Sequence, residues 1–197
     1  PSETPINQKL AQQKLGLNPQ KKYLLFFGLV RKYKGLDLLI KAMKSVVRKH
    51  PEVHLLVVGE HYESGQKYQN LVSSLGLESF ISFNNQFIAE EMITYWFSAA
   101  DLVVQPYRTS SQSGITPLAF TYEKPSLVTH VGGLAESIKH KRTGWIVEPS
   151  VAGIEEGIHS FINTDDPSTF VEAIRLEKKQ LHWSHFCEKC IEFSYSL

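Results

Sequence analysis

The chain has 197 residues, of which 42% are hydrophobic, and its 21 Lys and Arg against 20 Asp and Glu give a formal net charge of +1. This size suits one large domain or a pair of small ones and is enough to bury a substantial core. The even charge balance argues against nucleic acid or a strongly anionic membrane as a partner. The 2 cysteines exclude a disulfide scaffold and fit a reducing cytoplasm, and no apolar run approaches the roughly 20 residues that span a bilayer.

The first elements are a strand pattern followed by a helical pattern. Tyr23–Gly28 is a continuous apolar run, which is typical of a strand covered on both faces. Apolar residues then recur at helical spacing from Leu36 to Val47, until Pro51 ends the pattern. The same order is repeated by an apolar strand over Val53–Glu60 and a helix over 68–77.

The rest of the chain continues this alternation. A short strand over 80–85 precedes a helix over 89–100 that carries acids in its first turn. Three more strands are expected over 101–107, 125–133 and 144–149, with helical segments over 115–122, after Gly133, and from Val151 almost to the end. Residues 1–20 are expected to form a linker and lead-in helix, and residues 21–197 a single domain.

These patterns predict an α/β fold: a Rossmann-like, three-layer domain with a parallel sheet of about six strands, helices on both faces and a helical C-terminus. In such sheets, ligands bind beyond the carboxyl ends of the strands, at the point where the strand order reverses. Candidate functional residues are therefore expected in the strand-to-helix loops, which cover 28–35, 59–64, 84–88, 107–114 and 130–133.

The loop after the first strand places Arg31, Lys32 and Lys34 between two apolar segments. Its sequence matches neither the dinucleotide-binding glycine pattern nor the P-loop. A helix start favours an anion, Arg31 can hold phosphate oxygens in a fork, and Lys34 can add a point charge. A diphosphate site is one interpretation and a solvated basic loop is the other, and the spacing alone does not decide between them.

The segment Tyr107–Phe120 brings hydroxyls, an amide and a glycine to another helix start, which suits a polyhydroxy ligand or further phosphate oxygens. The candidate ligand contacts are Ser110, Ser111, Gln112, Ser113, Gly114, Ile115 and Thr116. The alternative is that these side chains only cap the helix and fill the loop. Gly132 and Gly133 mark a further turn where the backbone passes close to a ligand or to a neighbouring loop.

The C-terminal stretch contains metal-ligand residue types but not a ligand arrangement. His182, His185, Cys187 and Cys190 would spread over about 200° of arc on a helix, so they cannot converge on one ion. We therefore expect a plain terminal helix and no metal site. The mixed Lys and Glu residues just before it are typical of a solvated helix face rather than a nucleic-acid patch.

Several stretches together carry a family likeness. In chain order they are QKLGLNPQKKYLLFFG, the helix start with Lys34, Gly35, Asp37, Leu38 and Leu39, then VVGE, FISFNNQFIAEEM, FSAADLVVQPY, EKPSLVTHVGGLAE and TGWIVEP. With these, the chain resembles the carboxyl-terminal domain of family 4 retaining glycosyltransferases, the group 1 glycosyl transferases with the two-domain GT-B fold. The likeness covers nearly the whole chain.

The resemblance implies that this domain holds a nucleoside-diphosphate sugar. Lys34 matches the family lysine that neutralises the diphosphate, and Arg31 stands two residues after the usual position of the family arginine, which is Leu29 here. Gly28 would let the first loop approach the phosphates. The donor contacts would also include Glu60, and the loop with Phe87 and Ile88 would hold the base, largely through backbone groups.

One departure from the family pattern concerns two glutamates that contact the donor sugar and the ribose. Their positions fall at Ser110 or Ser111 and at Leu118 or Ala119, and Glu123 lies too far along the chain to replace them. The resemblance therefore does not identify the donor sugar or the mode of ribose recognition.

The expected function is sugar transfer, with retention, to an acceptor glycan or lipid-linked glycan, with no metal requirement and no cofactor. The acceptor would be bound by an amino-terminal domain outside this chain, so this domain alone is expected to be inactive. The expected location is cytoplasmic, with peripheral contact at the inner membrane face for the full-length enzyme. The alternatives are a nucleotide-sugar epimerase or phosphorylase of the same fold, or a non-catalytic nucleotide-binding module.

Overall fold

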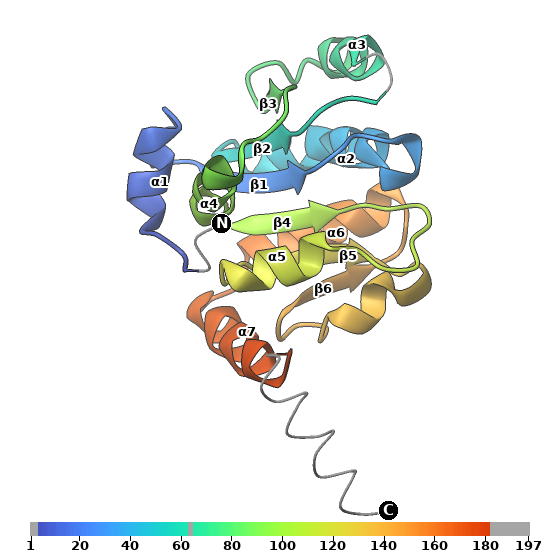
Figure 1. Ribbon diagram of the computed structural model, residues 1–197. Coiled ribbons are helices and arrows are strands. Elements are labelled where there is room, and N and C mark those ends of the chain that lie inside the picture. The colour runs from blue at the N-terminus through green and yellow to red at the C-terminus, as the bar shows by residue number, and fades with distance from the viewer. Residues whose placement is uncertain (1–3, 63–64, 182–197) are drawn as a thin grey trace, which may run out of the picture.

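The structure, a computed structural model, describes residues 4–62 and 65–181 and contains one parallel sheet (Figure 1). Its strands are β1 (Lys22–Phe27), β2 (Val53–Val58), β3 (Ile81–Asn84), β4 (Leu102–Gln105), β5 (Ser126–Thr129) and β6 (Gly144–Val147). They lie in the order β3-β2-β1-β4-β5-β6. The predicted six-stranded, Rossmann-like α/β fold is confirmed, and each strand lies within its predicted range or one residue outside it.

Helices cover both faces of the sheet (Figure 1). They are α1 (Gln8–Lys14), α2 (Leu36–Lys49), α3 (Gln66–Leu75), α4 (Glu90–Ala99), α5 (Ile115–Thr121), α6 (Val151–Ile162) and α7 (Ser168–Leu181), with 3-10 turns η1 (Lys32–Lys34) and η2 (Gly132–Ser137). Apolar side chains of α2, α3 and α6 pack on one face, and those of α4 and α5 pack on the other.

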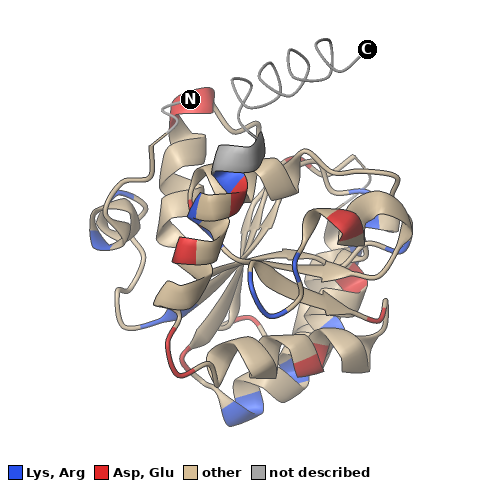
Figure 2. Cartoon of the chain, turned by 90° about the horizontal axis from the view of Figure 1, so that it is seen from below, with Lys and Arg blue, Asp and Glu red and all other residues tan. Residues whose placement is uncertain are grey.

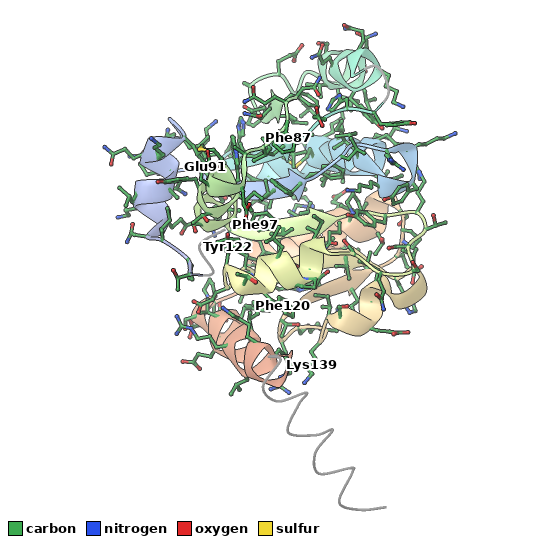
Figure 3. All side chains as sticks on the ribbon, viewed as in Figure 1. Phe87, Glu91, Phe97, Phe120, Tyr122 and Lys139 are labelled. Atoms are coloured by element: carbon green, nitrogen blue, oxygen red, sulfur yellow. The ribbon has the colours of Figure 1, made fainter. Side chains whose placement is uncertain are left out.

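The strands alternate between the two cores, which explains their uninterrupted apolar sequences. In β1, Leu24 and Phe26 join the core beneath α2, whereas Tyr23 and Leu25 join the core beneath α4 and α5. All four side chains are buried. In the second core Phe97 stacks on Tyr122 with ring centroids 5.5 Å apart (Figure 3).

Two predicted helical segments differ from the structure. The helix expected after Gly133 is only the 3-10 turn η2. The continuous helix expected from Val151 is divided into α6 and α7, because Asn163 ends α6 and Pro167 has no backbone N–H to continue it. Asp166 then accepts a hydrogen bond from the backbone N–H of Ser168, which begins α7. The His and Cys residues after position 181 lie outside the described residues.

Helix α1 is held at the amino end of the sheet by polar contacts with the end of α4. The Gln8 side-chain amide donates to the carbonyls of Ala99 and Ala100, at 3.2 and 3.3 Å, and Gln12 donates to Ala99 at 3.2 Å. These bonds pair carbonyls that helix α4 leaves without an intrahelical donor.

In the described part of the chain, no helix combines the length and apolarity needed to cross a bilayer.

Candidate functional site

The strand order reverses between β1 and β4, and the loops that follow these two strands meet there. The backbone N–H of Arg108 donates to the carbonyl of Tyr33 at 2.7 Å. A Cβ built on Gly35 would lie 1.9 Å from the carbonyl oxygen of Pro106, so only glycine allows this approach. The first loop and the loop after β4 therefore form one wall of a site at the switch point, where ligands of such sheets bind.

Lys34 is a buried cation in this wall. Its side chain is 9% exposed, and no carboxylate of the described residues lies within ion-pair distance of it. Its ammonium lies 3.2 Å from the position of a Cβ on Gly28 and 5.6 Å from the centroid of the Tyr107 ring. Burial, and then the charge of Arg31, lower the pKa of Lys34. A buried cation in this state is stabilised by an anion.

Tyr107 forms the far side of the Lys34 environment. Its ring is 3% exposed and meets the Tyr33 ring edge-on, with centroids 5.8 Å apart. Burial raises the pKa of Tyr107 to about 12, so the phenol stays protonated at neutral pH. Its hydroxyl lies 3.5 Å from Ser113 Oγ. The aromatic surroundings attract the ammonium without neutralising it.

Arg31 occupies a different environment from Lys34. It is exposed, and its guanidinium carbon lies 4.7 Å from the centroid of the Tyr62 ring, which is itself 71% exposed. The loops after β1 and β2 are paired here, because Val30 donates to the carbonyl of Glu60 and Tyr62 donates to the carbonyl of Val30. The structure therefore places the charge of Arg31 near Lys34, but with the guanidinium stacked on Tyr62 rather than buried.

A pocket of about 250 Å³ opens next to Gly28, on the side of the sheet that α4 covers. Its lining residues are Phe27, Gly28, Leu29, Gly59, Glu60, Gln86, Phe87, Ile88 and Ile93. The structure thus brings together the predicted residues Gly28, Glu60, Phe87 and Ile88 from three separate loops. Phe87, which is 77% exposed, forms the rim (Figure 3).

Gly59 lies in the predicted loop 59–64 but is not one of the predicted contacts, and it lines this pocket. Its φ is +134°, and a Cβ there would lie 2.4 Å from the carbonyl oxygen of Gly28. In the sequence, the only indication of this contact is the glycine that ends the second apolar run. The sequence pattern does not identify the backbone of Gly28 as its neighbour.

The hydroxyl cluster after β4 divides between surface and interior. Ser111, Gln112 and Gly114 are exposed. Ser110 is half-buried and its hydroxyl donates to the carbonyl of Gln112 at 2.9 Å, whereas Ser113 Oγ accepts from the N–H of Ile115 at 3.2 Å. Ser113 therefore binds the first residue of α5 from the loop, while the N-cap residue itself, Gly114, has no side-chain cap hydrogen bond.

Two further predicted contacts lie deeper in the fold. Ile115 is half-buried, with its Cδ1 3.7 Å from the position of a Cβ on Gly28. Thr116 is 1% exposed, and its hydroxyl accepts a hydrogen bond from the side-chain amide of Gln105 at 2.9 Å. Thr116 thus lies beneath the site and fixes α5 to β4 rather than facing the cleft.

The glycine pair after β5 serves the neighbouring loop. A Cβ on Gly132 would lie 1.9 Å from the carbonyl oxygen of Ser110, and one on Gly133 would lie 2.3 Å from that of Ser111. Of the two alternatives for these glycines, the structure has the close approach of a loop.

The positions at which the resemblance would place the two glutamates hold no carboxylate. Ala119 is fully buried among apolar side chains and Leu118 packs against the same core. Glu123 adopts a φ of 58°, and its two oxygens accept from Arg175 of α7, both at 2.8 Å. Within the described ranges, no group of three or more His, Cys, Asp and Glu side chains could hold a metal ion.

Sequence comparison agrees with this architecture. A family model described as Glycosyl transferases group 1 matches residues 7–177. The D-inositol 3-phosphate glycosyltransferase of Pseudarthrobacter chlorophenolicus is 30% identical over 189 residues, which cover 92% of this chain and 44% of that protein. The lipopolysaccharide core biosynthesis mannosyltransferase LpsB of Rhizobium meliloti is 31% identical over 152 residues, which cover 74% of this chain and 42% of that protein. The chain spans less than half the length of these curated relatives.

Solved structures share the fold. The C-terminal domain of the glycosyl transferase group 1 family protein LpcC from Francisella tularensis superposes with a TM-score of 0.81 at 23% identity, and covers 91% of this chain and 96% of that one. Anabaena HepE, solved in complex with UDP-glucose, superposes with a TM-score of 0.78 at 21% identity, over 96% of this chain and 52% of that one. The family match, the relatives and the sheet topology agree with one another, and the chain belongs to the glycosyl transferases group 1 family, with the fold of a GT-B carboxyl-terminal domain.

Proposed function

We propose that this domain binds the nucleoside-diphosphate sugar donor of a glycosyltransferase and that Lys34 receives its diphosphate. The observation that carries the proposal is the buried ammonium of Lys34 at the switch point, with no carboxylate of the described residues paired to it. HepE, a neighbour in fold, is described in complex with UDP-glucose, which agrees with a nucleotide sugar as ligand.

The nucleotide base is assigned to the pocket beside Gly28, Phe87 and Ile88. This pocket is mostly apolar and adjoins Lys34 through Gly28, so a base in it would lead its diphosphate toward the ammonium. The donor sugar would then extend toward the exposed residues Ser111, Gln112 and Gly114 at the start of α5. The backbone of this start and the Gln112 amide can donate hydrogen bonds to hydroxyl or phosphate oxygens.

The chemical step is the transfer of a sugar with retention. The bond between the anomeric carbon and a diphosphate oxygen breaks, the acceptor hydroxyl oxygen bonds to that carbon, and the hydroxyl proton is released. Negative charge develops on the leaving diphosphate, and Lys34, with Arg31 at the rim, stabilises it without a metal ion. Loss of one fixed contact of this kind raises a barrier by about 3–4 kcal/mol.

The acceptor, a glycan or lipid-linked glycan, is assigned to a further domain of the longer enzyme. The chain spans less than half the length of its curated relatives, which leaves room for such a domain. On this proposal the 197-residue chain binds the donor but transfers no sugar by itself.

Calorimetric titration with a panel of nucleoside diphosphates and their sugars tests the proposal. We expect one base to be preferred and Lys34→Ala to weaken its binding, whereas Lys44→Ala, on the exposed side of α2, leaves it unchanged. If no nucleotide in the panel binds, the assignment of Lys34 fails.

A second candidate is a nucleotide-binding module without catalysis. It is favoured by the absence of an acid at Ser110, Ser111, Leu118 and Ala119, together with the engagement of Glu123 by Arg175. Transfer assays on the longer protein separate the two, because the module would bind nucleotide sugar without turning it over.

A further inference from the structure

The pocket beside Phe87 contains two polar side chains in an otherwise apolar lining. They belong to Glu60, from the loop after β2, and Gln86, from the loop after β3. Every other residue of the described chain that lines the pocket is a glycine or has an apolar side chain. Within this lining, side-chain hydrogen bonds to a ligand can therefore come only from Glu60 and Gln86.

The backbone at Glu60 is fixed by both neighbouring loops. The Glu60 carbonyl accepts a hydrogen bond from the N–H of Val30 at 2.8 Å. The N–H of His61, the next residue, donates to Asn85 Oδ1 at 2.9 Å. The loops after β1, β2 and β3 are thus tied together at the pocket, and the Glu60 side chain starts from a fixed point of the backbone.

The fold uses neither of the two polar side chains. Glu60 and Gln86 are both exposed. Among the residues that the structure describes, no hydrogen bond or ion pair engages the Glu60 carboxylate or the Gln86 amide. Figure 2 shows Asp and Glu interspersed with Lys and Arg over the helices and loops, rather than gathered on one acidic face. Both side chains are therefore available to a ligand.

Opposite charges at the pocket set the direction in which a nucleotide would lie. The Lys34 ammonium lies 3.2 Å from the position of a Cβ on Gly28, and Gly28 itself lines the pocket. Lys34 attracts a diphosphate, whereas the Glu60 carboxylate repels one. In the proposed donor complex the diphosphate therefore lies toward Lys34, and Glu60 faces the base. Because a carboxylate only accepts hydrogen bonds, a base beside it has to supply the donors.

Guanine is the base whose edge fits this pair of side chains. It presents two adjacent donors, the ring N1–H and the exocyclic amino group, beside the carbonyl oxygen O6. The two carboxylate oxygens of Glu60 can accept from both donors, and the Gln86 amide can donate to O6. Uracil presents a single N–H between two carbonyl oxygens, so the second carboxylate oxygen would face another acceptor. An unfavourable contact of this kind discriminates between ligands as effectively as a favourable one.

We propose that the donor is a guanosine-diphosphate sugar and that Glu60 selects guanine in the pocket beside Phe87. This rests on the proposed donor function, to which it adds the identity of the base and the residue that recognises it. Gln86 supports the contact without deciding between bases, because its amide can present either its donor or its acceptor atom.

Calorimetric titration of the 197-residue chain with GDP, IDP, UDP, ADP and CDP tests the base. IDP is the matched ligand, because its base lacks only the exocyclic amino group of guanine. We expect GDP to bind about tenfold more tightly than IDP, and more tightly than the other three. Equal binding of GDP and IDP, or tighter binding of UDP, overturns the proposal while the donor function stands. If none of the nucleotides binds, both proposals fail.

The variant Glu60→Gln tests the residue with the least change of shape. Its amide places a donor against a guanine donor, so we expect GDP binding to weaken by at least about tenfold and the preference over IDP to shrink. UDP binding is expected to stay or to tighten, because the new amide can donate to a uracil carbonyl. Undiminished GDP binding, or an equal loss for GDP and UDP in a variant with unchanged thermal unfolding, overturns the role of Glu60.

Two further variants separate this contact from the general effects of charge and of the diphosphate site. Glu78→Gln removes the charge of an exposed acid before β3, outside the pocket, and is expected to keep the preference for GDP. Lys34→Ala is expected to weaken GDP and UDP by the same factor, because Lys34 meets the diphosphate that they share. A preference for GDP that is lost in Glu78→Gln as well as in Glu60→Gln would refute base selection by Glu60.

Discussion

Lys34 and Tyr107, from the loops after β1 and β4, meet at the switch point with the ammonium nitrogen 5.6 Å from the centroid of the phenol ring. The ring attracts the cation, while burial disfavours its charge and lowers the pKa of Lys34. The ring therefore holds the ammonium in place but, unlike a carboxylate, does not neutralise its charge. Because the pKa of Lys34 is lowered, binding of an anion is expected to change the protonation of this side chain.

We predict that diphosphate binding takes up protons at alkaline pH. In the folded protein the pKa of Lys34 is lowered from 10.5, so between the folded and unfolded pKa values the unfolded chain holds more protons, and stability from this group rises with pH there. A bound diphosphate raises the pKa again, so affinity falls as pH rises through the pKa of the free protein. Calorimetry in buffers of different ionisation enthalpy measures the uptake. It should vanish in Lys34→Met, and a wild-type profile without uptake would contradict the assignment.

The exposed Arg31 is predicted to contribute less than Lys34. Because its guanidinium stacks on the exposed Tyr62 ring, its attraction for a phosphate is screened by salt. We expect Arg31→Ala to weaken nucleotide diphosphate binding by about threefold to tenfold, and Lys34→Ala by about tenfold to a hundredfold. Titrations at low and high salt test this difference. The Arg31 effect should shrink with salt while the Lys34 effect persists, and the reverse order would show that Arg31 is the principal phosphate contact.

Gly59→Ala is predicted to destabilise the fold and close the pocket beside Phe87. Its φ of +134° is unfavourable for alanine, and the new Cβ would lie 2.4 Å from the carbonyl oxygen of Gly28. We expect a loss of about 1–3 kcal/mol in the free energy of unfolding, measured by urea denaturation. Gly114→Ala is the matched control, because no atom lies within 4 Å of its Cβ position and its φ is −67°. Equal effects of the two substitutions would refute the close approach as the cause.

Glu123→Gln is predicted to loosen α7 without affecting nucleotide binding. Hydrogen bonds from Arg175 lower the pKa of Glu123, so the stability that this carboxylate contributes is present above its usual pKa and is lost as pH falls through the lowered value. Thermal unfolding should show a decrease at neutral pH that disappears in acid. The exposed Glu91 of α4, labelled in Figure 3, gives the control Glu91→Gln. Weakened nucleotide binding in Glu123→Gln would instead show that Glu123 contributes to the donor site.

The elements were predictable because doubly buried strands leave uninterrupted apolar runs. Leu24, Phe26 and their neighbours in β1 face two cores at once, so no polar residue breaks the pattern. The division of the terminal helix was not predicted, because the apolar spacing continues across Asn163 and Pro167. The helix is nevertheless divided there, since Asn163 ends α6 and Pro167 has no backbone N–H to continue it.

The site was predictable as a set of loops but not as a set of contacts. Gly28, Phe87 and Ile88 line one pocket because parallel strands deliver their following loops to the same edge of the sheet. Ser111 and Thr116 look alike in the sequence, yet one is exposed and the other bonds Gln105 in the interior. Ser111 lies in the loop before α5, whereas Thr116 lies on the face of α5 that meets β4, and the sequence pattern does not show where the loop ends or which face of the helix is buried.

The side-chain hydrogen bonds of Gln8 and Gln12 attach α1 to the sheet far from the candidate site. Gln8 and Gln12 fasten the chain to the carbonyls of Ala99 and Ala100 at the edge of the sheet opposite the candidate site. Because this anchorage is remote from the loops that follow β1, β2 and β4, a substitution in those loops leaves the contacts of α1 intact. The attachment of α1 and the candidate site thus lie at opposite ends of the same sheet.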